Sequence, residues 1–209
     1  MNWPTATGYQ YHRRDELPLA PVRTVAPTDT PVSLDEMKLH LHVDGTDEDT
    51  LIQAYIDAAT AHLDGYAGIT GRALVTQTWR QDFAGFGPCL RLPVGPVETV
   101  SEVTYFDASN VQQTLADTVY TRLADALGSY VALKPGQSWP STYARQDAVS
   151  VTFVAGEAAD AVPAPLKVAI MLIAANWYEN REAVAIGGIP SEIPFGAAAL
   201  IAPYRRVGV

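Results

Sequence analysis

Two segments in the first third of the chain carry apolar residues at helical spacing. In the first segment, Ser33 and Glu36 have the spacing of a capping box, which predicts a helix that begins at Ser33 and ends near Asp44. The second segment, residues 47–66, follows Thr46, a residue type that caps helix N-termini. We therefore expect two amphipathic helices here. The apolar stripe of the second one consists of Ile52, Ile56, Ala59, Leu63 and Tyr66.

Residues 72–156 change to short stretches of β-branched and aromatic residues, separated by Gly, Pro, Asn, Asp and Ser. This pattern predicts five or six short strands in an antiparallel sheet or sandwich. Pro93 interrupts the stretch 90–94, which suits an edge strand because proline cannot donate a ladder hydrogen bond. The candidate strands are residues 75–83, 90–94, 97–106, 120–123, 130–133 and 149–154.

A last long helix is expected to begin at Pro163 or Pro165, because the first turn of a helix tolerates proline. Residues 166–175 are apolar on nearly all sides apart from Lys167, so this helix should be buried on most of them. The stretch is much shorter than the roughly 20 apolar residues of a membrane span, and we expect no membrane-spanning segment. Residues 176–181 are amphipathic and end the helix.

Together these patterns predict an α+β fold. Two N-terminal helices and one long C-terminal helix form a helical framework, and a small antiparallel β-sheet or sandwich is inserted between them. The first 31 residues contain five prolines and are typical of an extended arm. The expected boundaries are residues 1–31 for the arm, 32–71 and 157–184 for the helical bundle, 72–156 for the inserted β domain and 185–209 for a C-terminal tail.

Composition and charge narrow the class of protein. The chain has 209 residues, 48% hydrophobic and 18% charged, with a formal net charge of −9. The apolar content excludes disorder over most of the length, and a basic nucleic-acid-binding domain would carry a surplus of Lys and Arg. Acid is concentrated in residues 32–71, where eight Asp and Glu face Lys38 alone. These acids form a solvated helix face on one interpretation, and a surface that repels DNA or meets a basic partner on the other.

No motif in the sequence carries catalytic or metal-binding chemistry. His40 and His42 are two apart and point to different faces of a helix, and Cys89 is the single cysteine, so we expect neither a zinc site nor an intrachain disulfide. The glycines of residues 65–71 follow a helix and lack the Gly-Lys-Ser/Thr of a phosphate loop. Trp139 lies in a polar loop, either as a partner contact or as a cap on the sheet. We expect no cofactor, no metal and no enzymatic activity.

Six fragments, taken in order, resemble the head–tail connector (adaptor) proteins of long-tailed bacteriophages and of phage-like gene transfer agents. The occurrence of all six fragments in this order is more specific than any one fragment alone. The fragments are residues 31–41 (PVSLDEMKLHL), 47–59 (DEDTLIQAYIDAA), 71–79 (GRALVTQTW), 92–105 (with LPVGPV and VSEVTY), 151–167 (with VTFVAG and VPAPLK) and 177–182 (WYENRE).

The resemblance implies a structural role in a particle neck, with assembly in the host cytoplasm. Such adaptors form a dodecameric ring beneath the portal protein, join it to head-closure (stopper) or tail proteins, and continue the DNA channel without sequence-specific DNA binding and without a membrane. The expected portal contacts are Tyr204, Arg205, Arg206 and Val207. The candidate acids of the channel or an interface are Asp44, Asp47, Glu48, Asp49, Asp57 and Asp64. A free-standing binding module, for example for carbohydrate, and an enzyme of unknown class stay open as alternatives.

Overall fold

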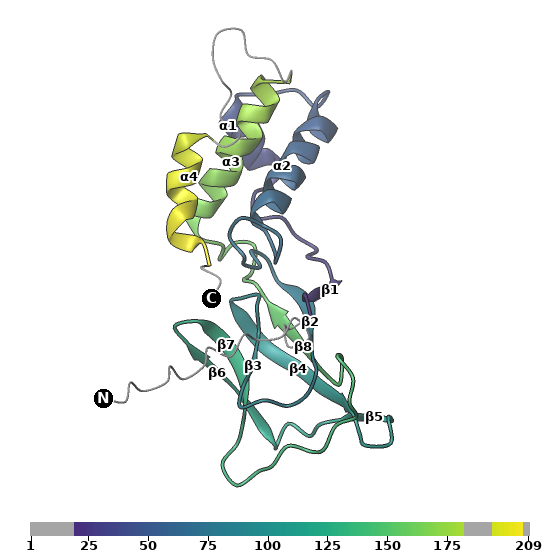
Figure 1. Ribbon diagram of the computed structural model, residues 1–209. Coiled ribbons are helices and arrows are strands. Elements are labelled where there is room, and N and C mark those ends of the chain that lie inside the picture. The colour runs from purple at the N-terminus through teal and green to yellow at the C-terminus, as the bar shows by residue number, and fades with distance from the viewer. Residues whose placement is uncertain (1–18, 182–193, 207–209) are drawn as a thin grey trace, which may run out of the picture.

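The computed structural model describes residues 19–181 and 194–206, and it shows an elongated subunit with helices at one end and strands at the other (Figure 1). The helices are α1 (Leu34–Leu41), α2 (Asp49–Leu63), α3 (Ala164–Glu179) and α4 (Phe195–Ile201), followed by a 3-10 helix, η2 (Ala202–Tyr204). The strands are β1 (Val22–Val25), β2 (Gln77–Phe83), β3 (Leu90–Arg91), β4 (Val97–Phe106), β5 (Gln112–Thr114), β6 (Tyr120–Asp125), β7 (Gly128–Leu133) and β8 (Val149–Ala155). The predicted α+β class is confirmed.

Helix α1 begins as the sequence predicts. The Ser33 side chain accepts a hydrogen bond from the Glu36 amide, and the Glu36 side chain accepts one from the Ser33 amide, so the capping box is complete. The helix ends at Leu41, earlier than the predicted end near Asp44. The physical reason is His42, whose left-handed backbone (φ 57°) lets its amide reach back to the last turn.

Helix α2 is shorter than the predicted residues 47–66. Thr46 is not its cap: the N-cap residue is Glu48, and no side chain caps the first turn. The Thr46 carbonyl instead accepts a hydrogen bond from the Asp49 amide, which forms a turn before the helix. At the other end, Asp64 adopts an extended backbone and terminates the helix.

Helix α3 is the centre of the helical half and contacts α1, α2 and α4 (Figure 1). Its buried residues follow the three-and-four spacing of one broad face: Leu166, Ala169, Ile170, Ile173 and Ala174. They pack with Met37 of α1, with Ile56 of α2 and with Ile201 of α4 in one core. Helix α3 is thus fully buried along one broad face and not on most sides as predicted, and Val168 is 38% exposed.

The β half is a sandwich of two antiparallel sheets that share one core. The five-stranded sheet has the order β1-β2-β8-β4-β5 and the three-stranded sheet the order β3-β7-β6. Alternate residues of β8, from Val149 to Ala155, are fully buried and face the core, together with Leu90 of β3 and Val131 of β7. Strand β3 lies at an edge, as Pro93 predicts, although it is only two residues long.

Two segments outside the predicted framework belong to the folded subunit. Strand β1 lies within the predicted arm, residues 1–31, and pairs with β2 of the same chain, although all four of its residues are exposed. Helix α4 lies within the predicted tail, residues 185–209, and buries Ala197 and Ile201 against the helical core. Both segments were too short for their apolar pattern to be distinguished from extended chain.

Candidate interaction surfaces

Asp64, which follows α2 directly, joins the helical half to the β half. Its Oδ1 accepts hydrogen bonds from the Leu74 amide (2.7 Å) and from Gln77 Nε2 (2.9 Å), and Arg23 Nη1 lies 3.4 Å from its Oδ2. The Asp64 side chain is only 6% exposed. The prediction that Asp64 belongs to an acidic surface is therefore wrong, because this carboxylate is covered and satisfied at the junction.

Arg206 joins the C-terminal segment to the β half. Its amide donates to the Thr70 carbonyl (2.8 Å). Its guanidinium donates to the main-chain carbonyls of Leu92 (3.2 Å), Pro93 and Leu127 (2.7 Å). Burial lowers the pKa of the Arg206 guanidinium, and the charges of two neighbouring arginines lower it further. Among the described residues no carboxylate pairs with this cation, so it acts as a hydrogen-bond donor that links three segments.

Two of the predicted acids, Glu48 and Asp49, are paired within the chain. Asp49 Oδ1 accepts a hydrogen bond from Lys38 Nζ at 2.6 Å. Glu48 accepts hydrogen bonds from the Tyr178 hydroxyl and from Arg181 Nη2, the latter at 2.7 Å. These hydrogen bonds lower the pKa of Glu48, and the carboxylate in turn raises the pKa of Tyr178. Both acids therefore stabilise the packing of helices and present little free charge.

Asp44, Asp47 and Asp57 are exposed. Within residues 19–181 and 194–206, none of the three forms an ion pair. Asp57 accepts a hydrogen bond from Gln53 Nε2 (2.8 Å), a neutral group that leaves its charge uncompensated. The predicted set of six acids is thus reduced to three that present their charge on the surface, in the α1–α2 connection and along α2.

Three of the four residues predicted to contact a portal, Tyr204, Arg205 and Arg206, lie beside the junction. Tyr204 is half-buried, and its ring centroid is 5.9 Å from Cζ of Arg72. Arg205 is exposed, whereas Arg206 is held by the carbonyls named above. Val207 lies outside the described residues. The portal contact stays a prediction, and Arg205 is its exposed cation.

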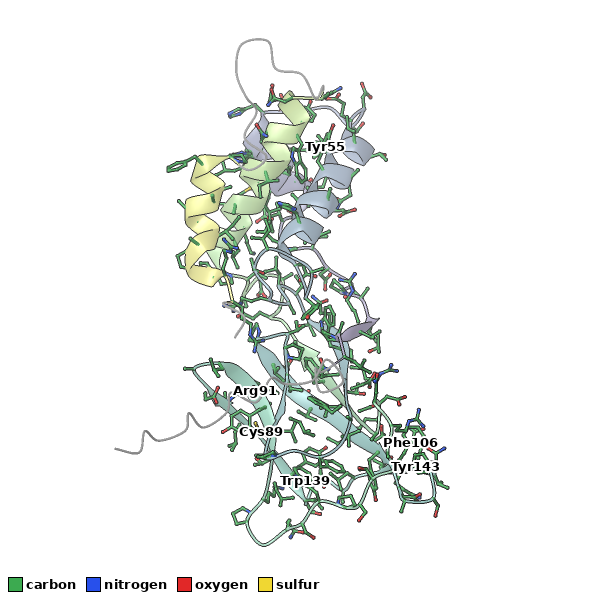
Figure 2. All side chains as sticks on the ribbon, viewed as in Figure 1. Tyr55, Cys89, Arg91, Phe106, Trp139 and Tyr143 are labelled. Carbon is green, nitrogen blue, oxygen red and sulfur yellow. The ribbon has the colours of Figure 1, made fainter. Side chains whose placement is uncertain are left out.

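Trp139 lies in an aromatic cluster at the end of the β half that is farthest from the helices (Figure 2). Its ring stacks on Phe86, with centroids 4.6 Å apart and planes 5° apart, and its Nε1 donates to the Gly87 carbonyl at 3.1 Å. Phe86 in turn lies 5.7 Å from the ring of Tyr105. The ring of Trp139 is partly buried against the β core, which agrees with its interpretation as a cap on the sheet.

In the described part of the chain, no three His, Cys, Asp or Glu residues gather closely enough to hold a metal ion. No helix among the same residues is long and apolar enough to cross a membrane. Cys89 is a free thiol and is half-buried. The polar contacts hold segments of the subunit together, and the exposed acids and loops form its outer surface.

Comparisons with known proteins agree with this picture. The model of the family "Phage gp6-like head-tail connector protein" matches residues 31–105. A chain in the neck of an empty gene transfer agent (GTA) particle, computed with C6 symmetry, is 27% identical, with a TM-score of 0.73 over 91% of this chain and 97% of that chain. The expected resemblance to the head–tail connector family is confirmed. No curated protein matches the chain.

Two further solved structures extend the likeness of this chain to components of GTA particles. A chain in the virion of a native GTA particle is 28% identical, with a TM-score of 0.72, and a chain in the neck of a native GTA particle, computed with C12 symmetry, is 27% identical, with a TM-score of 0.71. Each match covers 91% of this chain and 97% of the other. The family model ends at the close of β4, whereas the structural likeness extends over both halves of the subunit.

Sequence reasoning missed Gln77 and the role of Arg206 in joining the halves. Gln77 is 2% exposed and begins the alternation Gln77, Trp79, Gln81, whose members all face inward. A polar residue at an inward position of a strand is a signal for a buried hydrogen bond, and it was available in the sequence. Arg206 gave no such signal, because its three guanidinium acceptors come from two separate turns of the β half.

Proposed function

We propose that this head–tail connector is a ring subunit in the neck of a phage or GTA particle, where it joins the portal protein to head-closure or tail proteins. The observation that carries the proposal is the extent of the likeness to chains of GTA necks, which covers 91% of this chain. Because the match includes both the helices and the strands, the likeness extends over the whole fold of the neck protein and is not limited to one common motif. The proposal gives the chain no catalytic role.

The ring is proposed to hold twelve copies around the DNA, in keeping with the C12 symmetry of one matched neck. A closed ring of identical subunits uses two different patches on each subunit, one for each neighbour. Asp44, Asp47 and Asp57 are proposed to face the channel or its rim, where like charge keeps the phosphate backbone from binding tightly. Arg205, in the C-terminal segment, is proposed to contact the portal.

Deletion of the gene in the cell that produces the particles tests this role. We expect heads without tails, and tails restored by expression of the intact chain from a plasmid. Quantitative mass spectrometry of complemented particles should give as many copies of this chain as of the portal protein, or a small-integer ratio to it. Tailed, active particles from the deletion strain, or purified particles without the chain, would overturn the proposal.

A further inference from the structure

Two loops without charge lie at the end of the β half that is farthest from the helices (Figure 2), and the Arg145–Asp147 ion pair follows the longer loop. The loops are residues 84–89, which connect β2 to β3, and residues 135–144, in the connection from β7 to β8. Neither contains Asp, Glu, Lys or Arg, in a chain of which 18% of the residues are charged. We call these two loops the β tip. Figure 2 shows its labelled residues Trp139 and Tyr143 at the end of the sandwich opposite the helices.

Contacts within the molecule hold the two loops in one arrangement. Besides the Trp139–Phe86 stack, a Cβ placed on Gly85 would lie 3.6 Å from Oγ1 of Thr142, so the loops lie against each other. The Tyr143 amide donates to the Phe106 carbonyl (3.0 Å), which fixes the longer loop to the end of β4. A surface that is already ordered loses little conformational entropy when a partner binds.

The composition of the β tip is that of a protein-binding surface. The connection between β7 and β8 runs from residue 134 to 148 without regular structure, a length that is uncommon in compact domains unless the loop has a function. Tyr143 is 45% exposed, and the small uncharged residues Thr142 and Ala144 adjoin it in the sequence. Aromatic residues are enriched and charged residues are depleted at the centres of protein interfaces.

We propose that the β tip binds a second, different neck protein through a surface of the partner that is also uncharged. The inference rests on the proposed function, because a joint between two components needs a docking surface for each. The portal-contact candidate, Arg205, directly precedes Arg206, whose amide donates to the Thr70 carbonyl at the helix–strand junction. The β tip, in contrast, lies at the far end of the sandwich (Figure 2).

Two variants test this site, each with a matched control. Ser141→Glu places a charge on the exposed β tip, and its control Ser101→Glu places the same charge on exposed β4. Tyr143→Ala removes the exposed ring, and its control Tyr66→Ala removes a ring of similar exposure at the end of α2. Thermal unfolding of each purified subunit verifies folding, and Ser141→Glu decides the question if Tyr143→Ala does not fold.

The readout is the composition of particles from cells in which each variant replaces the native chain. We expect both β-tip variants to give heads that keep this chain at the normal copy number but carry at least about tenfold fewer tails, as for loss of an interface hot spot, and both controls to give tailed particles. Three results would overturn the inference: normal tails with both β-tip variants, loss of this chain from the heads, or tailed particles that fail only to attach to cells, which would indicate a glycan ligand. Absence of the unaltered chain from particles would instead refute the proposed function.

Discussion

Gly128 lies directly against Arg206: a Cβ at Gly128 would come within 2.5 Å of Nη2 of the arginine. Gly128 also has φ +117°, a backbone conformation that side chains disfavour. The glycine begins β7, and the arginine is among the last described residues of the chain. The turn before β7 is thus shaped to receive the cation that links the C-terminal segment to the β half.

Gly128→Ala is expected to lower the free energy of unfolding by about 2–3 kcal/mol, because it combines backbone strain with displacement of a guanidinium that is held by the carbonyls of Leu92, Pro93 and Leu127. Gly136→Ala is the matched control: it also has positive φ (+78°), but its added Cβ meets nothing within 4 Å, so about 1 kcal/mol is expected. Urea unfolding measures both. In an Arg206→Ala background the cost of Gly128→Ala should shrink, and an unchanged cost would show that the collision with Arg206 does not matter.

Asp64→Ala is expected to destabilise the subunit by about 2–3 kcal/mol, since it leaves the Leu74 amide and the Gln77 amide group without their acceptor. Asp57→Ala removes an exposed carboxylate from the same helix region and should change the stability by less than about 0.5 kcal/mol. Chemical denaturation compares the two. Equal effects would contradict the account of Asp64 as the residue that joins the halves.

The sequence was sufficient to predict the elements that depend on residues close together along the chain. The Ser33 capping box, the stripe of α2 from Ile52 to Leu63 and the apolar face of α3 all lie in contiguous residues, so their periodicity is visible without the fold. Tyr66, predicted as the last residue of that stripe, lies beyond the end of α2 and is 50% exposed. The edge position of β3 followed from one proline. In each case the local preference and the tertiary packing agree.

Features that depend on distant partners were not predictable. Asp64 looked like one more acid in an acidic segment, because its burial depends on Leu74 and on Gln77 of β2. Strand β1 looked like part of an arm, since its four residues are exposed and its order comes from pairing with β2. The β tip was not predictable because its two loops are far apart in the sequence, and their contact depends on the folded sandwich.

The Arg91–Asp125 pair predicts a pH dependence in acid. Two hydrogen bonds from Arg91 (2.9 and 2.6 Å) lower the pKa of Asp125 to about 2. Because the folded pKa lies below the unfolded value of about 3.9, the pair contributes to stability above about pH 4, and this contribution is lost as the pH falls through about 2. Asp125→Asn should therefore be less stable than the native chain at pH 5 and converge with it near pH 2. Unfolding curves across this range measure the difference, and NMR titration measures the pKa; a difference that is constant with pH would contradict the assignment.

Reversal of the exposed acids is expected to impair DNA passage and not assembly. In the triple variant Asp44→Lys, Asp47→Lys and Asp57→Lys, cations would bind the phosphate backbone and slow its movement through the neck. We expect tailed, filled particles whose DNA delivery to recipient cells is reduced. The reversal Glu98→Lys, Glu102→Lys and Asp117→Lys on the β half is the charge-matched control and should leave delivery unchanged. Equal delivery by both variants would exclude the acids from the channel.

The central claim is that this chain forms a ring in the neck between portal and tail. Electron cryomicroscopy of purified particles tests it most directly, through a symmetry-averaged reconstruction of the neck. The account predicts twelve copies of this subunit next to the portal, with the C-terminal segment toward the portal and the β tip against the next neck protein. A resolved neck in which no density fits this subunit would contradict the account.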